Sequence, residues 1–180
     1  MPFLGIPLIE RLRDRLQILN SEIIIISNDF SGYEYLDLPL HRDVLPNRGA
    51  LGGLLTALTI TKTPFLGLIA ADMPFASPQL LAYLLEEIQH GDADAALPST
   101  SSGLEPLHSV YRRDTCLPLV KDAINRDLWR MRSWYDQARL LVLEPQNTTE
   151  VAGNAHTFIN LNTPGEFSAA EELAHKLKLL

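Results

Sequence analysis

With 180 residues, of which 46% are hydrophobic and 21% charged, the chain fits one globular domain over residues 1–180 and is not a disordered protein. Its formal net charge of −7 disfavours non-specific binding to nucleic acid or to a membrane surface, since both need a cationic protein. The single cysteine, Cys116, excludes an intramolecular disulfide framework, and a reducing cytoplasm is the expected location.

The sequence begins with a helical pattern that gives way to a strand pattern. Leucines at helical spacing between Pro7 and Leu19 predict an amphipathic helix with charged residues outside its apolar stripe. Four consecutive isoleucines, Ile23–Ile26, then predict a buried strand. Because polar residues follow directly, Asn28 is a candidate ligand-binding residue at the carboxyl end of that strand.

A second short strand and a glycine-rich helix start come next. Residues 38–41 predict the strand, and the loop after it contains Asp43. The helix expected over residues 49–60 opens with several glycines, among them Gly49 and Gly52, where a ligand can approach the backbone closely.

The most distinctive stretch is an apolar run that stops abruptly at a carboxylate. Residues 65–71 contain no polar side chain and are too short to span a membrane, which predicts a fully buried parallel strand. Asp72 would stand at its carboxyl end, where α/β sheets bind ligands, and could hold a divalent metal. The alternative is an ordinary turn residue. Ser77 and Pro78 then begin the next helix.

Strand and helix patterns continue to alternate to the end of the chain. We expect strands over residues 93–98, 107–111, 140–143 and 157–161. We expect helices over residues 115–125, 127–138 and 163–177. This alternation predicts an α/β fold with three layers around a mostly parallel sheet.

Two asparagines lie near the end of the sequence, just before the last helix. Asn160 and Asn162 are two residues apart, so on an extended strand both side chains would face the same way. Two neutral amides could bond a ligand, whereas the alternative is that they serve a local turn and the backbone. Thr163-Pro164-Gly165-Glu166 has the pattern of a capping box, which predicts the helix start.

Other chemistries find little support. The five histidines show no metal-ligand spacing, and adjacent His108 and Ser109 on a strand would point to opposite faces, which excludes a nucleophile and base pair. Seven basic residues gather between Arg112 and Arg139, interleaved with aspartates. They form either a solvated surface or, if functional, an anion site.

Several motifs together resemble the molybdenum cofactor guanylyltransferases, which are MobA-like nucleotidyltransferases. The motifs are Asp72-Met-Pro-Phe after the apolar strand, Asp43 with Gly49-Ala-Leu-Gly52-Gly53, Glu105-Pro106-Leu107 with Tyr111-Arg112-Arg113, and Phe158-Ile-Asn160-Leu-Asn162-Thr-Pro. Their order and spacing match over nearly the whole chain. The resemblance implies a Rossmann-like nucleotidyltransferase fold and transfer of GMP from Mg-GTP to molybdopterin.

The resemblance also implies roles for individual residues. Asp72 matches the metal-binding aspartate, which would hold Mg²⁺. Asn28 and Asp43 match contacts to the guanosine, next to Gly49 and Gly52 of the same motif. Asn160 and Asn162 match residues near the reacting phosphates and the pterin, and the 112–139 region would face the pterin. Further implied partners are proteins of molybdenum cofactor biosynthesis or acceptor molybdoenzymes.

One departure from the family pattern is visible at the start of the sequence. Family members open with a strand and a Leu-Ala-Gly-Gly-type loop for the GTP phosphates, whereas this sequence begins inside a later family segment. We therefore expect two strand edges without a partner, weak binding of Mg-GTP and no activity of this chain alone. The alternatives are a transferase that uses CTP or another nucleotide, and a non-catalytic module that binds the pterin cofactor or a partner.

Overall fold

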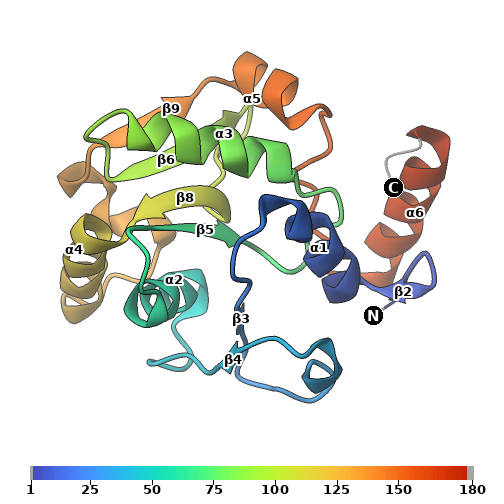
Figure 1. The fold of residues 1–180 in the computed structure, drawn as a ribbon, viewed down its shortest axis with the longest axis horizontal. Helices are drawn as coiled ribbons and strands as arrows, with labels where there is room; N and C mark the ends of the chain where they lie inside the picture. The colour runs from blue at the N-terminus through green and yellow to red at the C-terminus, as the bar shows by residue number, and fades with distance from the viewer. Residues whose placement is uncertain (1, 178–180) are drawn as a thin grey trace.

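The central sheet is open and places strands in the order β5 (Phe65–Ile69), β8 (His108–Arg112), β6 (Ala95–Thr100) and β9 (Leu140–Leu143). A short strand, β7 (Gly103–Leu104), extends one end of β6 as a hairpin. The computed structural model describes residues 2–177 and is drawn in Figure 1. β8 pairs antiparallel with both β5 and β6, and β9 pairs parallel with β6, so β5, β6 and β9 all run in one direction.

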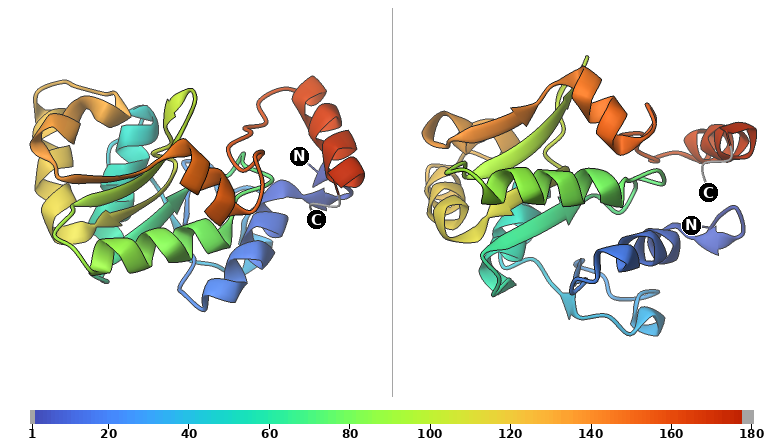
Figure 2. Two further views of the ribbon diagram at one scale, coloured as in Figure 1. Left: turned by 90° about the horizontal axis from the view of Figure 1, so that it is seen from above. Right: turned by 45° about the horizontal axis from the view of Figure 1, so that its top comes forward.

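Helices cover both faces of this sheet, which confirms the expected three layers (Figures 1 and 2). One face packs against α3 (Pro78–Gln89) and α5 (Pro145–Ala152). The other packs against α2 (Gly49–Ile60), α4 (Arg113–Asn125) and the 3-10 helix η3 (Met131–Gln137). Neighbouring residues of β6 alternate between the two clusters, because successive side chains of a strand point to opposite faces.

The two ends of the described chain pack together beside the sheet. The N-terminal end forms the hairpin β1 (Pro2–Phe3) and β2 (Ile6–Pro7), the helix α1 (Leu8–Leu16) and the 3-10 helix η1 (Gln17–Leu19). The C-terminal helix α6 (Pro164–Leu177) lies against this hairpin (Figure 2). Phe3, Leu8 and Ala170 share their cluster with Phe75 and Leu161, so the cluster also holds the loop after β5.

Two further strands form a small sheet of their own. β3 (Ile25–Ile26) pairs parallel with β4 (Leu40–His41), and the 3-10 helix η2 (Glu34–Leu36) lies between them in sequence. Among the described strands, β5 pairs only with β8 and β3 only with β4. The expected strand edges without a partner are therefore present. Such an edge, when apolar, can pair with other chains unless something covers it.

Four expectations about elements were wrong. Residues 157–158 form a turn and residues 159–161 have no regular secondary structure, where a strand was expected, and residues 127–138 are helical only as η3. Residues between β9 and residue 157, expected as a polar loop, contain α5, with Pro145 in its first turn. The fully buried parallel strand expected over residues 65–71 was also wrong, since β5 is only partly buried and pairs antiparallel with β8. The reversed direction of β8 was not foreseen, because periodicity does not distinguish parallel from antiparallel strands.

The glycines at the start of α2 serve the backbone itself. Gly49 has a φ of +55°, a backbone conformation that residues other than glycine rarely adopt. A Cβ on Gly52 would lie 2.7 Å from Cβ of Arg48 and 3.3 Å from the carbonyl oxygen of Leu45, whereas a Cβ on Gly53 would meet nothing within 4 Å. Gly52 therefore lets the preceding loop fold closely onto the helix.

This difference predicts opposite effects of one substitution at neighbouring positions. Gly52→Ala should lower the free energy of unfolding by about 1–3 kcal/mol, because Arg48 and the loop must shift. Gly53→Ala should raise it by about 0.5–1 kcal/mol, because alanine favours a helix interior where space is free. Urea unfolding of both variants measures this. Equal effects at the two positions would contradict the account of Gly52.

Candidate functional site

Asp72 lies just beyond the carboxyl end of β5, as the sequence predicted. Its side chain is half-buried, and Oδ1 is buried without a hydrogen-bond partner among residues 2–177. Burial raises the pKa of the Asp72 carboxyl above its ordinary value. A buried carboxylate oxygen without a partner is costly in an empty protein but well suited to bind a cation.

Asn160 and Asn162 lie next to Asp72 in space, although they are far apart from it in sequence. The amide of Leu161 donates to the Asp72 carbonyl oxygen at 3.0 Å, so the segment with both asparagines docks onto the Asp72 loop. Leu161 is buried, while the asparagines on either side of it are exposed. Buried and exposed side chains thus alternate over residues 160–162 as they would on a strand, although these residues form no strand.

The capping box after Asn162 is confirmed. The amides of Asn162 and Thr163 donate to Oε2 of Glu166 at 2.6 and 2.8 Å, and the Glu166 amide donates to Oγ1 of Thr163 at 3.3 Å. Only the backbone of Asn162 takes part in these bonds. No bond of either asparagine side chain to another described residue is found, so both amide groups are available to a ligand.

Asn28 and Asp43 also meet, at the carboxyl ends of β3 and β4. Nδ2 of Asn28 donates to Oδ2 of Asp43 at 2.8 Å, and the Asp43 amide donates back to Oδ1 of Asn28 at 3.1 Å. The hydroxyl of Thr56 in α2 lies 3.2 Å from the other carboxylate oxygen of Asp43 and 3.0 Å from the Gly52 carbonyl oxygen, so these two acceptors share its single proton. The parallel register of β3 and β4 explains this pairing, because it places each residue two positions beyond its strand.

The structure therefore gathers the candidate residues into two groups. Asp72, Asn160 and Asn162 form one at the end of β5, whereas Asn28 and Asp43 form the other, near the start of α2 with Gly49 and Gly52. The groups belong to separate sheets, and α2 contacts both β3 and β5. No hydrogen bond between described residues links one group directly to the other.

The interpretation that the whole 112–139 region faces a substrate does not hold for Arg112 and Arg139. The Arg112 guanidinium donates to the carbonyls of Ile88, Gly91 and Ala93, and Arg139 pairs with Asp92 and Asp94. Arg112 pairs in register with Phe65, at the start of β5, and Arg139 directly precedes β9. These side chains therefore lie at the end of the strands opposite to the end that carries Asp72.

Part of the region remains available. The exposed side chains of Arg130 and Arg132 make no ion pair with the described residues, whereas Arg126 pairs with Asp122 at 3.3 Å. The guanidinium of Arg48, from the loop before α2, stacks over the ring of Trp129 at 3.6 Å. This contact joins the arginines after α4 to the group around α2.

Comparison with known proteins decides the family. Residues 1–140 match the MobA-like NTP transferase domain.

The chain belongs to the MobA-like NTP transferase family.

Members of this family and other proteins of the same fold resemble the chain over most of its length. A probable molybdenum cofactor guanylyltransferase of Chloroflexus aggregans is 34% identical over 91% of the chain and 79% of that protein. One of Natronomonas pharaonis is 29% identical over 93% of the chain and 85% of the relative. The structure of molybdopterin-guanine dinucleotide biosynthesis protein A from Archaeoglobus fulgidus has a TM-score of 0.83, 22% identity, and covers 98% of the chain and 89% of that protein. The last likeness concerns the fold.

The described residues of this MobA-like domain do not form a metal site with several protein ligands. Within residues 2–177 no group of three or more His, Cys, Asp or Glu side chains could hold a metal ion. A magnesium ion bound at Asp72 would need further oxygens from a substrate and water, a common arrangement for Mg²⁺ at phosphates. Among helices of the same residues, none has the length and apolar character needed to cross a bilayer.

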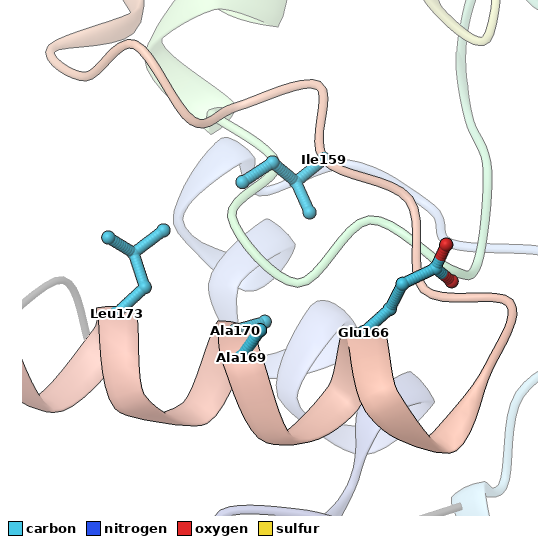
Figure 3. Close-up of a pocket in the computed structure, with 5 residues that line it drawn as sticks. All are labelled: Ile159, Glu166, Ala169, Ala170 and Leu173. Carbon is cyan, nitrogen blue, oxygen red and sulfur yellow. The ribbon is translucent and has the colours of Figure 1, made fainter.

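A cavity of about 180 Å³ beside α6 does not belong to either group of candidates (Figure 3). Its walls are Ile159, Ala169, Ala170, Leu173 and Glu166. The Glu166 carboxylate already accepts the two amides of the capping box. The cavity therefore offers apolar walls and no free polar group suited to a phosphate.

Sequence reasoning missed two contributors to the site. Thr56 could have been found from the sequence, since it is a polar residue among the leucines of α2. In the structure it is fully buried. The stacking of Arg48 on Trp129 could not have been found in this way, because the partners are far apart in sequence and only the fold joins them.

Proposed function

We propose that this nucleotidyltransferase transfers GMP from Mg-GTP to molybdopterin to form the guanine dinucleotide cofactor. An acceptor oxygen would form the new bond to the α-phosphorus of GTP, and the bond to the β-phosphate would break and release pyrophosphate. The names of the relatives support this substrate pair. The observation that carries the proposal is the partnerless Asp72 oxygen on a loop to which the segment with two free asparagine side chains is bonded.

Asp72 would hold the magnesium ion through Oδ1, the oxygen that lacks a partner. When bound, the metal would neutralise charge on the triphosphate. Asn160 and Asn162 would donate hydrogen bonds from their amides to phosphate or pterin oxygens. Transfer of this kind needs positioning and charge neutralisation more than a covalent nucleophile, which fits a site made of one carboxylate and two amides.

Asn28 and Asp43 would bind the guanosine, next to Gly49 and Gly52. An ionised carboxylate can accept about four hydrogen bonds, and two of the Asp43 positions are taken by Asn28 and Thr56. The remaining positions could accept the adjacent ring and amino N–H groups of guanine. Cytosine lacks the ring N–H donor, so this carboxylate favours GTP over the alternative CTP.

Arg130 and Arg132 would meet the anionic acceptor. The chain has a net charge of −7, so an anionic substrate needs local positive charge. The two guanidinium groups are exposed and without an acidic partner among the described residues, and Trp129 with Arg48 adds a flat stacked surface beside them. The enzyme would act in the cytoplasm, where the free thiol of buried Cys116 stays reduced.

Replacement of Asp72 tests the metal assignment. We expect Asp72→Ala to lower GMP transfer at least about a thousandfold, about 4 kcal/mol, because the metal then lacks its protein ligand. Transfer of labelled GMP to molybdopterin measures it in the chain extended by the family's opening strand and phosphate loop, since we expect no activity of this chain alone. The control is Asp92→Ala, because Asp92 is an exposed carboxylate at the opposite end of the strands. Activity in Asp72→Ala equal to that of the control would refute the assignment.

Removal of the free arginines tests the acceptor assignment. The double variant Arg130→Ala, Arg132→Ala should raise KM for molybdopterin about tenfold or more, since each charge-assisted bond contributes about 1.5–3 kcal/mol. KM for GTP should stay within about twofold. Arg126→Ala is the matched control, because Arg126 already pairs with Asp122. A rise in KM for GTP instead would place these arginines on the nucleotide.

A further inference from the structure

Loop 72–77, the larger part of the connection between β5 and α3, carries Asp72 without any regular secondary structure to hold it. Three bonds from distant parts of the chain anchor it. Leu161 donates to the Asp72 carbonyl, Arg15 Nε donates to the Ala76 carbonyl at 3.1 Å, and the Ser77 amide donates to Nε2 of His108 at 3.0 Å. The third bond alone uses a titratable side chain as the acceptor.

His108 is fully buried at the first position of β8, opposite Ile69 at the end of β5. An amide N–H can only donate, so Nε2 must carry a lone pair and the ring is neutral with its proton on Nδ1. Burial, which lowers the pKa of His108 to about 4, keeps this form at neutral pH. Nδ1 has no partner among residues 2–177, although it is buried.

This arrangement indicates what the histidine contributes. An orphaned buried donor costs free energy, and an apolar side chain of similar size would avoid that cost. The gain that distinguishes histidine here is the acceptor for Ser77. Ser77 is the N-cap of α3, and its hydroxyl accepts the Leu80 amide at 3.2 Å, so His108 fixes both the end of the loop and the start of the helix.

His108 also touches the second segment of the site. Its ring packs edge to face against Phe158, with the ring centres 5.7 Å apart. Phe158 lies two residues before Asn160, in the segment that bonds to Asp72 through Leu161. One buried side chain therefore contacts both segments whose polar groups carry the proposed chemistry.

We propose that His108 is a positioning residue that fixes loop 72–77 and the segment 158–162 relative to each other, so that Asp72 and the two asparagines converge on the same substrate. The claim that this positioning serves GMP transfer rests on the proposed function. The claim that His108 holds the two segments together rests only on the contacts of His108.

Two variants of His108 distinguish its role as a hydrogen-bond acceptor from its role in packing. The Oε1 atom of glutamine can occupy the place of Nε2, whereas the Oδ1 atom of asparagine reaches only the place of Nδ1. In His108→Asn the Ser77 amide should exchange with solvent at least about tenfold faster, and the amide signals of Leu161, Asn160 and Asn162 should shift in NMR spectra. His108→Gln should restore slow exchange and the original signals.

The control is Ser109→Ala, which removes a buried hydroxyl from the next position of β8 that bonds to the Glu105 carbonyl. It should leave the Ser77 amide and the signals of residues 160–162 unchanged. His108→Asn behaving like this control, or His108→Gln behaving like His108→Asn, would overturn the positioning role.

Kinetics extend the same test to function. His108→Asn should lower kcat about tenfold or more with KM for GTP changed less than threefold, and His108→Gln should recover kcat. Unchanged kcat in His108→Asn alongside disturbed 158–162 signals would overturn the claim that this positioning serves transfer. These rates are measured in the chain extended by the family's opening strand and phosphate loop, because we expect no activity of this chain alone. An extended wild-type protein that transfers no nucleotide would contradict the proposed function, while the NMR comparison on this chain still decides the structural role.

Discussion

The hydrogen bond from the Leu161 amide to the Asp72 carbonyl is the contact on which the candidate site depends. It joins the loop after β5 to a segment almost ninety positions later, and neither has regular secondary structure at that point. Burial supports the bond, since Met73, Phe75 and Leu161 pack against α1, α6 and the N-terminal hairpin. Because these partners come from both ends of the chain, the site is completed only when the ends pack together.

The same contact explains how a single carboxylate, Asp72, could hold the proposed metal ion. Backbone bonds and packing fix the position of Asp72, so its side-chain oxygen needs no further bond to stay in place. Thr56, Asn28 and Asp43 show the opposite design, in which side chains satisfy one another. In the proposed function, the first group would use its free acceptor and donors for a metal and phosphates, whereas the second would offer a firmly oriented carboxylate for a base.

Strand ends were the part of the site that the sequence predicted well. The apolar run before Asp72 and the isoleucines before Asn28 placed both residues just beyond the carboxyl ends of strands, although both strands are shorter and less buried than expected. The meeting of Asn28 with Asp43 followed from two parallel strands with equal offsets. The reversal of β8 and the irregular backbone of residues 157–161 depend on tertiary contacts, which local periodicity does not encode. For the same reason Arg112, close in sequence to other arginines, belongs to the opposite end of the strands.

Anomalous diffraction from crystals grown with Mn²⁺ and a non-hydrolysable GTP analogue tests the central claim most directly. The metal should give a peak about 2 Å from Oδ1 of Asp72, with the triphosphate within reach of the Asn160 and Asn162 amides. A metal and triphosphate bound away from Asp72, with its Oδ1 still without a partner, would contradict the account.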